Sequence, residues 1–316
     1  METTLLPAKN KTNKSIRQTA KKRHETIFLI CMLALPFIQW LIFWLYVNLS
    51  SIALAFQSER TGAFTFDNFV RFWDNLTSPY GEIKIALRNT MLYFATSILV
   101  IMPLSFIIAY FFYKRIRFYK AFRIIFYLPC IINAVAMVAV YTNFIDPVGP
   151  LGLVVKFFGG KMDPEGLLGK PSTATWTIIV YTIWTGFGTN MLLFGSAMTR
   201  IPVDMIESAR LDGVGPFREL VSIILPLVWS SISTVIIVTC TSIFNSSGPI
   251  LLFTNGSQET TTISFWIFQQ VYANGKVGGS GSYNLVSCAG LCFTLVGVPL
   301  ILGIRKLLEK VPTVEY

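Results

Sequence analysis

Residues 201–226, IPVDMIESARLDGVGPFRELVSIILP, form a charged island in a strongly apolar chain. Seven charged side chains lie at 200–219, between two runs, 171–199 and 220–258, that contain none. Runs of this length are typical of helices that cross a bilayer, which need about 20 mostly apolar residues. The island is therefore interpreted as a loop between two membrane spans.

Within this loop the residue pattern predicts a short amphipathic helix on the membrane surface. Pro202 suits a first helical position, and the acids Asp204 and Glu207 suit the positive end of a helix. Gly213 suits the left-handed residue that commonly ends a helix. We interpret this helix as a docking element.

The composition of the whole chain also indicates a membrane protein. Of its 316 residues, 53% are hydrophobic and only 13% are charged, whereas soluble domains carry about 25% charged residues. Six charge-free runs are each long enough to cross a bilayer. The predicted spans are 27–47, 90–113, 124–144, 175–198, 220–243 and 283–304. A seventh run, Thr260–Gly275, is too short to span, and we expect it to be interfacial or re-entrant.

The distribution of basic residues predicts the orientation. Six spans place the two tails and the segments 114–123 and 200–218 on the same side of the membrane. These segments carry 18 Lys and Arg, whereas the segments on the opposite side carry 8. Because such an excess marks the cytoplasmic side, both termini are predicted to be cytoplasmic. The net charge of +10 then reflects topology and does not indicate nucleic-acid binding. The predicted divisions are a basic tail (1–26), a six-helix transmembrane domain (27–310) with its loop at 200–219, and a C-terminal tail (311–316).

The loop resembles the EAA motif of ABC importer permeases. The similarity rests on Glu207-Ser208-Ala209, Asp212-Gly213, Phe217, Ile223 and Leu225-Pro226. Ser208 replaces an alanine of the motif, and Val214 follows the glycine where alanine is usual. The adjoining IP and LP pairs are similar to those of carbohydrate-type permeases of the maltose kind. The resemblance implies an all-α, type I ABC importer permease fold.

The resemblance also implies that this loop is a coupling helix that sits in a groove of a cytoplasmic ATPase. Glu207 and Gly213 are then expected to hold the helix in the groove. Arg210 and Arg218 pair with acids of the ATPase, or are ordinary cations at the membrane surface. The expected coupling residues are Asp204, Glu207, Ala209, Arg210, Asp212 and Gly213.

The energy source is expected to lie in a partner. The sequence contains no G-x-x-x-x-G-K-[ST] stretch, so this chain has no Walker A loop for ATP. ATP and Mg are expected on the ATPase, and the chain itself is expected to hold no cofactor, to bind no metal and not to be an enzyme. An ion-coupled secondary transporter of a small polar solute is the alternative, and the absence of ionisable residues from the predicted spans argues against it.

Uncharged polar residues gather in three predicted spans. Asn133, Tyr141 and Asn143 lie in the third, and further clusters lie around Thr182–Asn190 and Thr239–Ser246. Hydroxyls, amides and aromatic rings are groups that hold sugars. Hydrogen bonds between helices are the alternative explanation for each of these residues.

The resemblance selects some of them as sugar contacts. On the fourth span the sugar-contacting positions of the family that the chain resembles fall on Thr182, Thr185, Gly186 and Thr189. On the fifth span, placed from Phe253-Thr254-Asn255-Gly256, they fall on Ser242, Ile243 and Ser246, although Ser257-Gln258 replaces the usual Gly-Pro. Asn245 neighbours these positions and is added to the expected sugar contacts because its amide can hydrogen-bond to sugar hydroxyls. Small residues here favour an oligosaccharide, unless the partner permease makes most of the contacts.

These observations predict one permease subunit of an ATP-driven, binding-protein-dependent importer of a sugar or oligosaccharide, located in a prokaryotic cell membrane. The expected partners are a second, non-identical permease, two copies of an ABC ATPase, an extracellular solute-binding protein and membrane lipid.

Overall fold

The computed structural model describes residues 9–59, 61–245, 248–273 and 283–311. Within these ranges the chain is helical and contains no β-strand beyond a single bridge between Gln57 and Phe64. The predicted all-α class is therefore correct. The first half contains α1 (Lys9–Trp40), η1 (Leu41–Tyr46), α2 (Val47–Ala55), α3 (Asp67–Thr77), α4 (Glu82–Thr96), η2 (Ser97–Ile101), α5 (Met102–Tyr113), α6 (Tyr119–Ile131), α7 (Ala134–Ile145) and α8 (Pro150–Phe157).

The second half contains the predicted loop and the helices on either side of it. Its elements are α9 (Pro171–Met198), α10 (Val203–Leu211), α11 (Pro216–Glu219), η3 (Leu220–Ile224), α12 (Leu225–Leu227), α13 (Trp229–Thr241), α14 (Ile250–Phe253), α15 (Ile263–Phe268), η4 (Gln269–Ala273) and α16 (Tyr283–Glu309). The elements named η are π-helical turns within longer helices. Such turns often lie near functional sites.

The helices that could cross a membrane agree with most of the predicted spans. Among the described residues five are long and apolar enough, and a sixth is added if one bent pair counts as a single span. The predicted spans 27–47, 90–113, 175–198 and 283–304 lie inside four of them, Glu25–Ala55, Glu82–Tyr113, Pro171–Met198 and Tyr283–Glu309.

The third predicted span, 124–144, is wrong as one continuous helix. The chain breaks between α6 and α7, and the candidate span begins at Ala134 and runs to Phe157. Pro129 lacks the backbone N–H that would continue the α6 ladder, and Ile132 is extended. The Asn133 side chain then accepts a 2.8 Å hydrogen bond from the Val135 N–H and caps the start of α7.

The fifth predicted span, 220–243, is present but bent. Its two parts, Pro216–Leu227 and Trp229–Thr241, meet at an angle of 73°. Val228 between them leaves helical geometry. Pro226 explains the bend, because its ring cannot donate to the helix and crowds the preceding turn.

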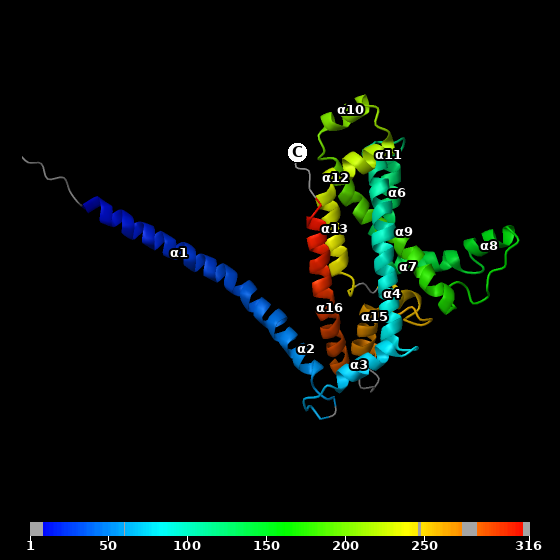
Figure 1. The fold of residues 1–316 in the computed structure, drawn as a ribbon, viewed down its shortest axis with the longest axis horizontal. Helices are drawn as coiled ribbons and strands as arrows, with labels where there is room; N and C mark the ends of the chain where they lie inside the picture. Colours follow the sequence, from blue (N-terminus) through cyan, green and yellow to red (C-terminus); the bar gives the residue numbers. More distant parts are fainter. Residues whose placement is uncertain (1–8, 60, 246–247, 274–282, 312–316) are drawn as a thin grey trace, which may run out of the picture.

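Most helices from α2 onward form a bundle, from which α8 projects, and α1 leads away from it on the other side (Figure 1). None of the most apolar window of Glu25–Ala55 is buried within the chain. The loop helix α10 and the C-terminal end of α16 lie at one end of the bundle, and α3 lies at the other.

The short run predicted to be interfacial or re-entrant forms α15 and η4, and its last residues lie outside the described part. Ile263, Phe265 and Trp266 of α15 are buried, so this helix lies inside the bundle. Asn89 of α4 donates to the carbonyl oxygens of Glu259 and Thr261 at 2.6 and 2.9 Å. These bonds hold the segment before α15 against the middle of α4.

Candidate coupling loop and solute pocket

The helix α10 begins and ends at identifiable residues. Pro202 precedes it in an extended conformation, so the first helical position is Val203 and not Pro202 as predicted. At the other end Gly213 has a φ of +72°, which confirms the predicted left-handed residue. The Gly213 N–H donates to the Arg210 carbonyl at 3.0 Å and the Val214 N–H to the Ala209 carbonyl at 3.1 Å. This pair of bonds is a Schellman motif, which stops the helix and turns the chain.

One side of α10 is anchored in the body of the chain. Ile206 and Ala209 are buried, and Ile206 joins a hydrophobic cluster with Met198 of α9 and Leu220 and Ile224 of η3. Ala209, one of the expected coupling residues, therefore packs within its own chain. The anchor fixes which side of α10 faces outward.

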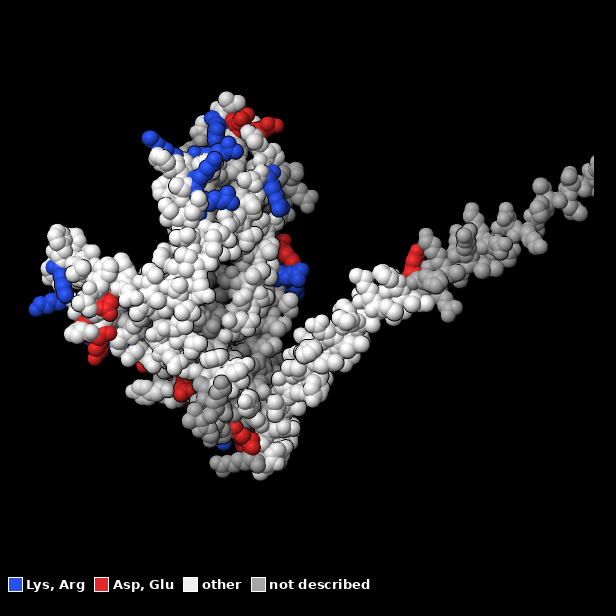
Figure 2. Space-filling model, turned by 180° about the vertical axis from the view of Figure 1, so that it is seen from behind, with Lys and Arg blue, Asp and Glu red and all other residues white. Residues whose placement is uncertain are grey.

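The outward side of α10 carries the other expected coupling residues. Exposed side chains or backbone are found at Asp204, Glu207, Arg210, Asp212 and Gly213. Exposed apolar side chains accompany them, with Leu211 90% and Phe217 79% accessible. Lys and Arg gather at this end of the molecule around a few acids (Figure 2). The loop thus presents a mixed charged and apolar surface.

A pocket of about 280 Å³ lies between the helix α4–η2, α9 and α13. No charged residue lines it. The lining residues are Thr90, Tyr93, Phe94, Ser97, Ile101, Thr182, Gly186, Asn190, Val238, Thr239, Ser242 and Ile243.

The hydroxyl groups of this pocket are mainly available as acceptors. Thr182 and Ser242 each donate to the carbonyl four residues earlier, at 2.9 Å, and Ser97 does the same. Their oxygen lone pairs remain free to accept a hydrogen bond. The Tyr93 hydroxyl is different, because it is buried and has no hydrogen-bond partner within the described structure. The pocket therefore combines acceptors with one uncommitted phenol.

Comparison with known proteins identifies the family. A family model described as "Binding-protein-dependent transport system inner membrane component" matches residues 101–311, which is more than half of the chain. The chain belongs to this family. The matched region begins within η2 and includes the loop at 200–219, so the family resemblance seen in the EAA motif is confirmed.

Individual relatives of this permease are distant. The lactose transport system permease protein LacF of Rhizobium radiobacter is 24% identical over 73% of this chain and 78% of its own length. The maltose/maltodextrin transport system permease protein MalF of Escherichia coli is 26% identical over 61% of this chain, which is 39% of MalF. Both names are those of transport permeases and not of enzymes.

Solved structures confirm the fold. A crystal structure of a bacterial ABC transporter involved in the import of the acidic polysaccharide alginate has a TM-score of 0.77 and 22% identity, and covers 93% of this chain and 99% of that one. A bacterial alginate ABC transporter has also been solved in complex with an alginate pentasaccharide-bound periplasmic protein (TM-score 0.75). The permease therefore has the expected ABC importer fold, and the description of its family places it in the inner membrane.

The pocket of the permease brings together half of the residues predicted to contact solute. Thr182, Gly186, Ser242 and Ile243 line it. Thr185 does not, and its carbonyl lies 2.9 Å from the Cys130 sulfur of α6. Thr189 and Asn245 are exposed and do not line the pocket, and Ser246 lies outside the described residues.

The pocket also contains residues that were not selected from sequence. On α9 the lining positions Thr182, Gly186 and Asn190 recur every four residues, so Asn190 continues the same helix face. On the helix α4–η2, Thr90, Tyr93 and Ser97 follow at intervals of three and four. That spacing of polar residues in an apolar span is a signal that could have identified this wall.

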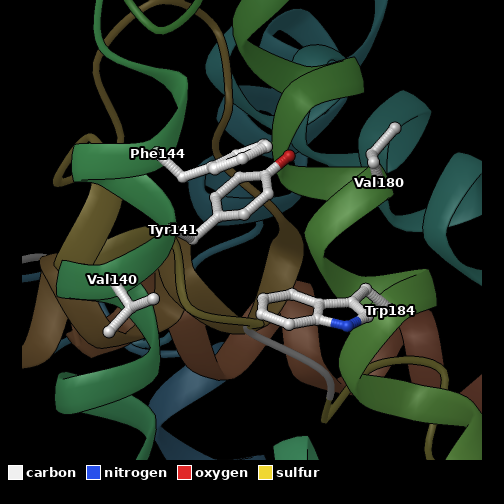
Figure 3. A pocket seen from close by; sticks show the side chains of 5 residues that line it. All are labelled: Val140, Tyr141, Phe144, Val180 and Trp184. Carbon is white, nitrogen blue, oxygen red and sulfur yellow. The ribbon is translucent and has the colours of Figure 1, made fainter. Parts of the chain in front are cut away.

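A second pocket of about 300 Å³ lies on the other side of α9 and is apolar (Figure 3). Val140, Tyr141 and Phe144 of α7 face Val180 and Trp184 of α9 across it. The Tyr141 hydroxyl donates to the Thr177 carbonyl at 3.0 Å, so its polar group is already used within the chain. Tyr141 and Trp184 thus belong to an aromatic contact between helices and do not line the polar pocket.

Proposed function

We propose that this permease is one membrane subunit of an ATP-driven importer of a sugar or oligosaccharide, with α10 as its coupling helix. The observation that carries this proposal is the form of α10. A capped helix is anchored through Ile206, and it exposes Glu207 and Asp204 at the basic end of the molecule. An exposed surface of mixed charge with apolar side chains suits a partner protein.

The nature of the solute is proposed from the pocket and from the relatives. The relatives are named for lactose and maltodextrin transport, and the solved structure for alginate import. The polar pocket contains hydroxyl acceptors, the Asn190 amide and the Tyr93 phenol, and it carries no charge. Such a surface suits a neutral saccharide, because sugar hydroxyls both donate and accept hydrogen bonds.

A second permease subunit is proposed from the position of α1. The exposed apolar side chains from Ile27 to Tyr46, in α1 and η1, extend away from the bundle, whereas α2 packs against α16. Within a membrane this helix can pack against another subunit. The family description also supports an extracellular solute-binding protein as a partner.

The direct test is copurification of the permease with its ATPase and ATP-dependent sugar uptake in proteoliposomes. Glu207→Lys should abolish copurification and uptake because it reverses a charge on the exposed face of α10. Asp74→Lys makes the same charge change at an exposed site in α3, at the other end of the molecule, and should leave both measurements near wild type. Full binding and uptake with Glu207→Lys would exclude this face as the coupling surface.

A further inference from the structure

A buried ion pair joins the end of α5 to the segment that follows the coupling helix. Lys114 is the residue after α5, and Glu219 is the last residue of α11. The Lys114 ammonium lies 2.5 Å from one carboxylate oxygen of Glu219 and donates to the other at 2.6 Å. The Glu219 side chain is only 3% exposed and that of Lys114 19%. Burial makes this pair unlike the exposed ion pairs elsewhere in the chain.

A second contact reinforces this connection one helical turn earlier. The Tyr110 hydroxyl donates to the carbonyl oxygen of Pro216, the first residue of α11, at 3.2 Å. The Lys114 ammonium also lies 5.6 Å from the centre of the Tyr110 ring. Together, Tyr110 and Lys114 hold both ends of α11, and we call this set of contacts the α5–α11 contact.

The α5–α11 contact lies between the coupling loop and the pocket. On one side only residues 212–215 separate α11 from α10. On the other side α5 continues through η2 into α4, in a helical stretch from Glu82 to Tyr113. Thr90, Tyr93 and Ser97 of that stretch line the polar pocket. A displacement of α11 is therefore applied to the same helix that forms a wall of the pocket.

We propose that the α5–α11 contact transmits movement of α10 to the helix α4–α5, so that Lys114 and Glu219 are positioning residues for coupling. This inference rests on the proposed function. A buried ion pair adds little to stability compared with an apolar pair of the same size, but its short hydrogen bond and close charge contact fix the geometry of the two elements. A rigid link is what transmission of a displacement needs, whereas apolar packing alone allows the two surfaces to slide.

The test removes both charges at once, because a single substitution leaves the other charge buried without a partner. Lys114→Met with Glu219→Gln keeps the approximate size of both side chains. In proteoliposomes that contain the whole transporter, the measured quantity is sugar taken up per ATP hydrolysed. We expect the double variant to assemble and to hydrolyse ATP, with uptake per ATP reduced at least threefold. Lys114→Glu with Glu219→Lys, which restores opposite charges, should recover part of that loss.

The matched control is Arg305→Met with Glu309→Gln. This pair has a 2.7 Å contact but is more than half exposed, and it should leave uptake per ATP unchanged. An unchanged uptake per ATP in the neutral Lys114/Glu219 variant overturns the inference. Loss of assembly in both the neutral and the charge-exchanged variants also overturns it, because the pair would then be purely structural. If the wild-type transporter shows no ATP-dependent uptake, the proposed function itself is wrong and the inference falls with it.

Discussion

At the scale of single residues, Gly186 is a lining position where the polar pocket leaves little room for a side chain. A Cβ atom at this position would lie 3.2 Å from the Ile101 side chain across the pocket. We expect Gly186→Trp to fill the space between α9 and η2 and to abolish uptake, since the indole would occupy the volume proposed for solute. Uptake by the reconstituted transporter is the measurement, with copurification of the ATPase as the check on assembly.

Gly303→Trp is the control for this substitution. Gly303 lies in α16, is exposed, and has no atom near the place where its Cβ would be. The same large side chain should be tolerated there with near-normal uptake. Normal transport by Gly186→Trp would contradict the assignment of the pocket.

Two tyrosines make a matched pair of tests at the same scale. The Tyr93 hydroxyl is buried without a partner in the described structure, whereas the Tyr141 hydroxyl bonds to the Thr177 carbonyl. Tyr93→Phe should hardly change thermal stability but should raise the KM for uptake about 2- to 10-fold if sugar supplies the missing bond. Tyr141→Phe should lower stability by about 1 kcal/mol and leave KM unchanged. Equal KM values in both variants would remove Tyr93 from the solute site.

At the scale of elements, the two glycines after α10 differ in backbone conformation. Gly213 has a φ of +72°, while Gly215 has a φ of −71°, and neither has an atom near its missing Cβ. Gly213→Ala should cost about 1 kcal/mol, because only the left-handed conformation penalises the methyl group. We expect Gly213→Ala to weaken binding of the ATPase in a pull-down titration, and Gly215→Ala to leave it unchanged. The reverse order would show that the Schellman turn does not set the position of α10.

The elements also show what the sequence could and could not predict. Charge-free runs located the spans, because charge is excluded from the bilayer core. They did not reveal the break at Asn133, since an uncharged capping residue leaves the run 124–145 free of charge. The bend at Val228 was likewise hidden, although Pro226 was visible in the LP pair.

The residues of the candidate site were predicted only as far as a helix face can be inferred from the spacing of residues in the sequence. Gly186 and Thr182 line the pocket, but Thr185 and Thr189 lie on an adjoining face, which becomes known only when α6 and α13 are placed around α9. Lys114 and Glu219 are 105 residues apart, and no local pattern brings them together. The sequence therefore did not reveal which residues that are distant along the chain lie next to each other in the fold.

At the scale of the whole molecule, the source of energy can be tested directly. No charged residue lines the polar pocket of the permease, so it contains no group to carry a proton. Uptake in proteoliposomes should stop with vanadate and should continue when a protonophore collapses the proton gradient. Uptake that follows the gradient and ignores vanadate would support the ion-coupled alternative.

The exposed helix α1 has a consequence for how the cell makes this protein. An apolar helix with none of its most apolar window buried in its own chain is surrounded by lipid until the proposed second subunit packs against it. A copy synthesised in excess would keep this helix without protein contacts, and membrane proteases could reach it. The amount of mature permease should therefore follow the amount of the proposed partner subunit. The ratio of the two subunits would be set after translation, by degradation of unassembled copies.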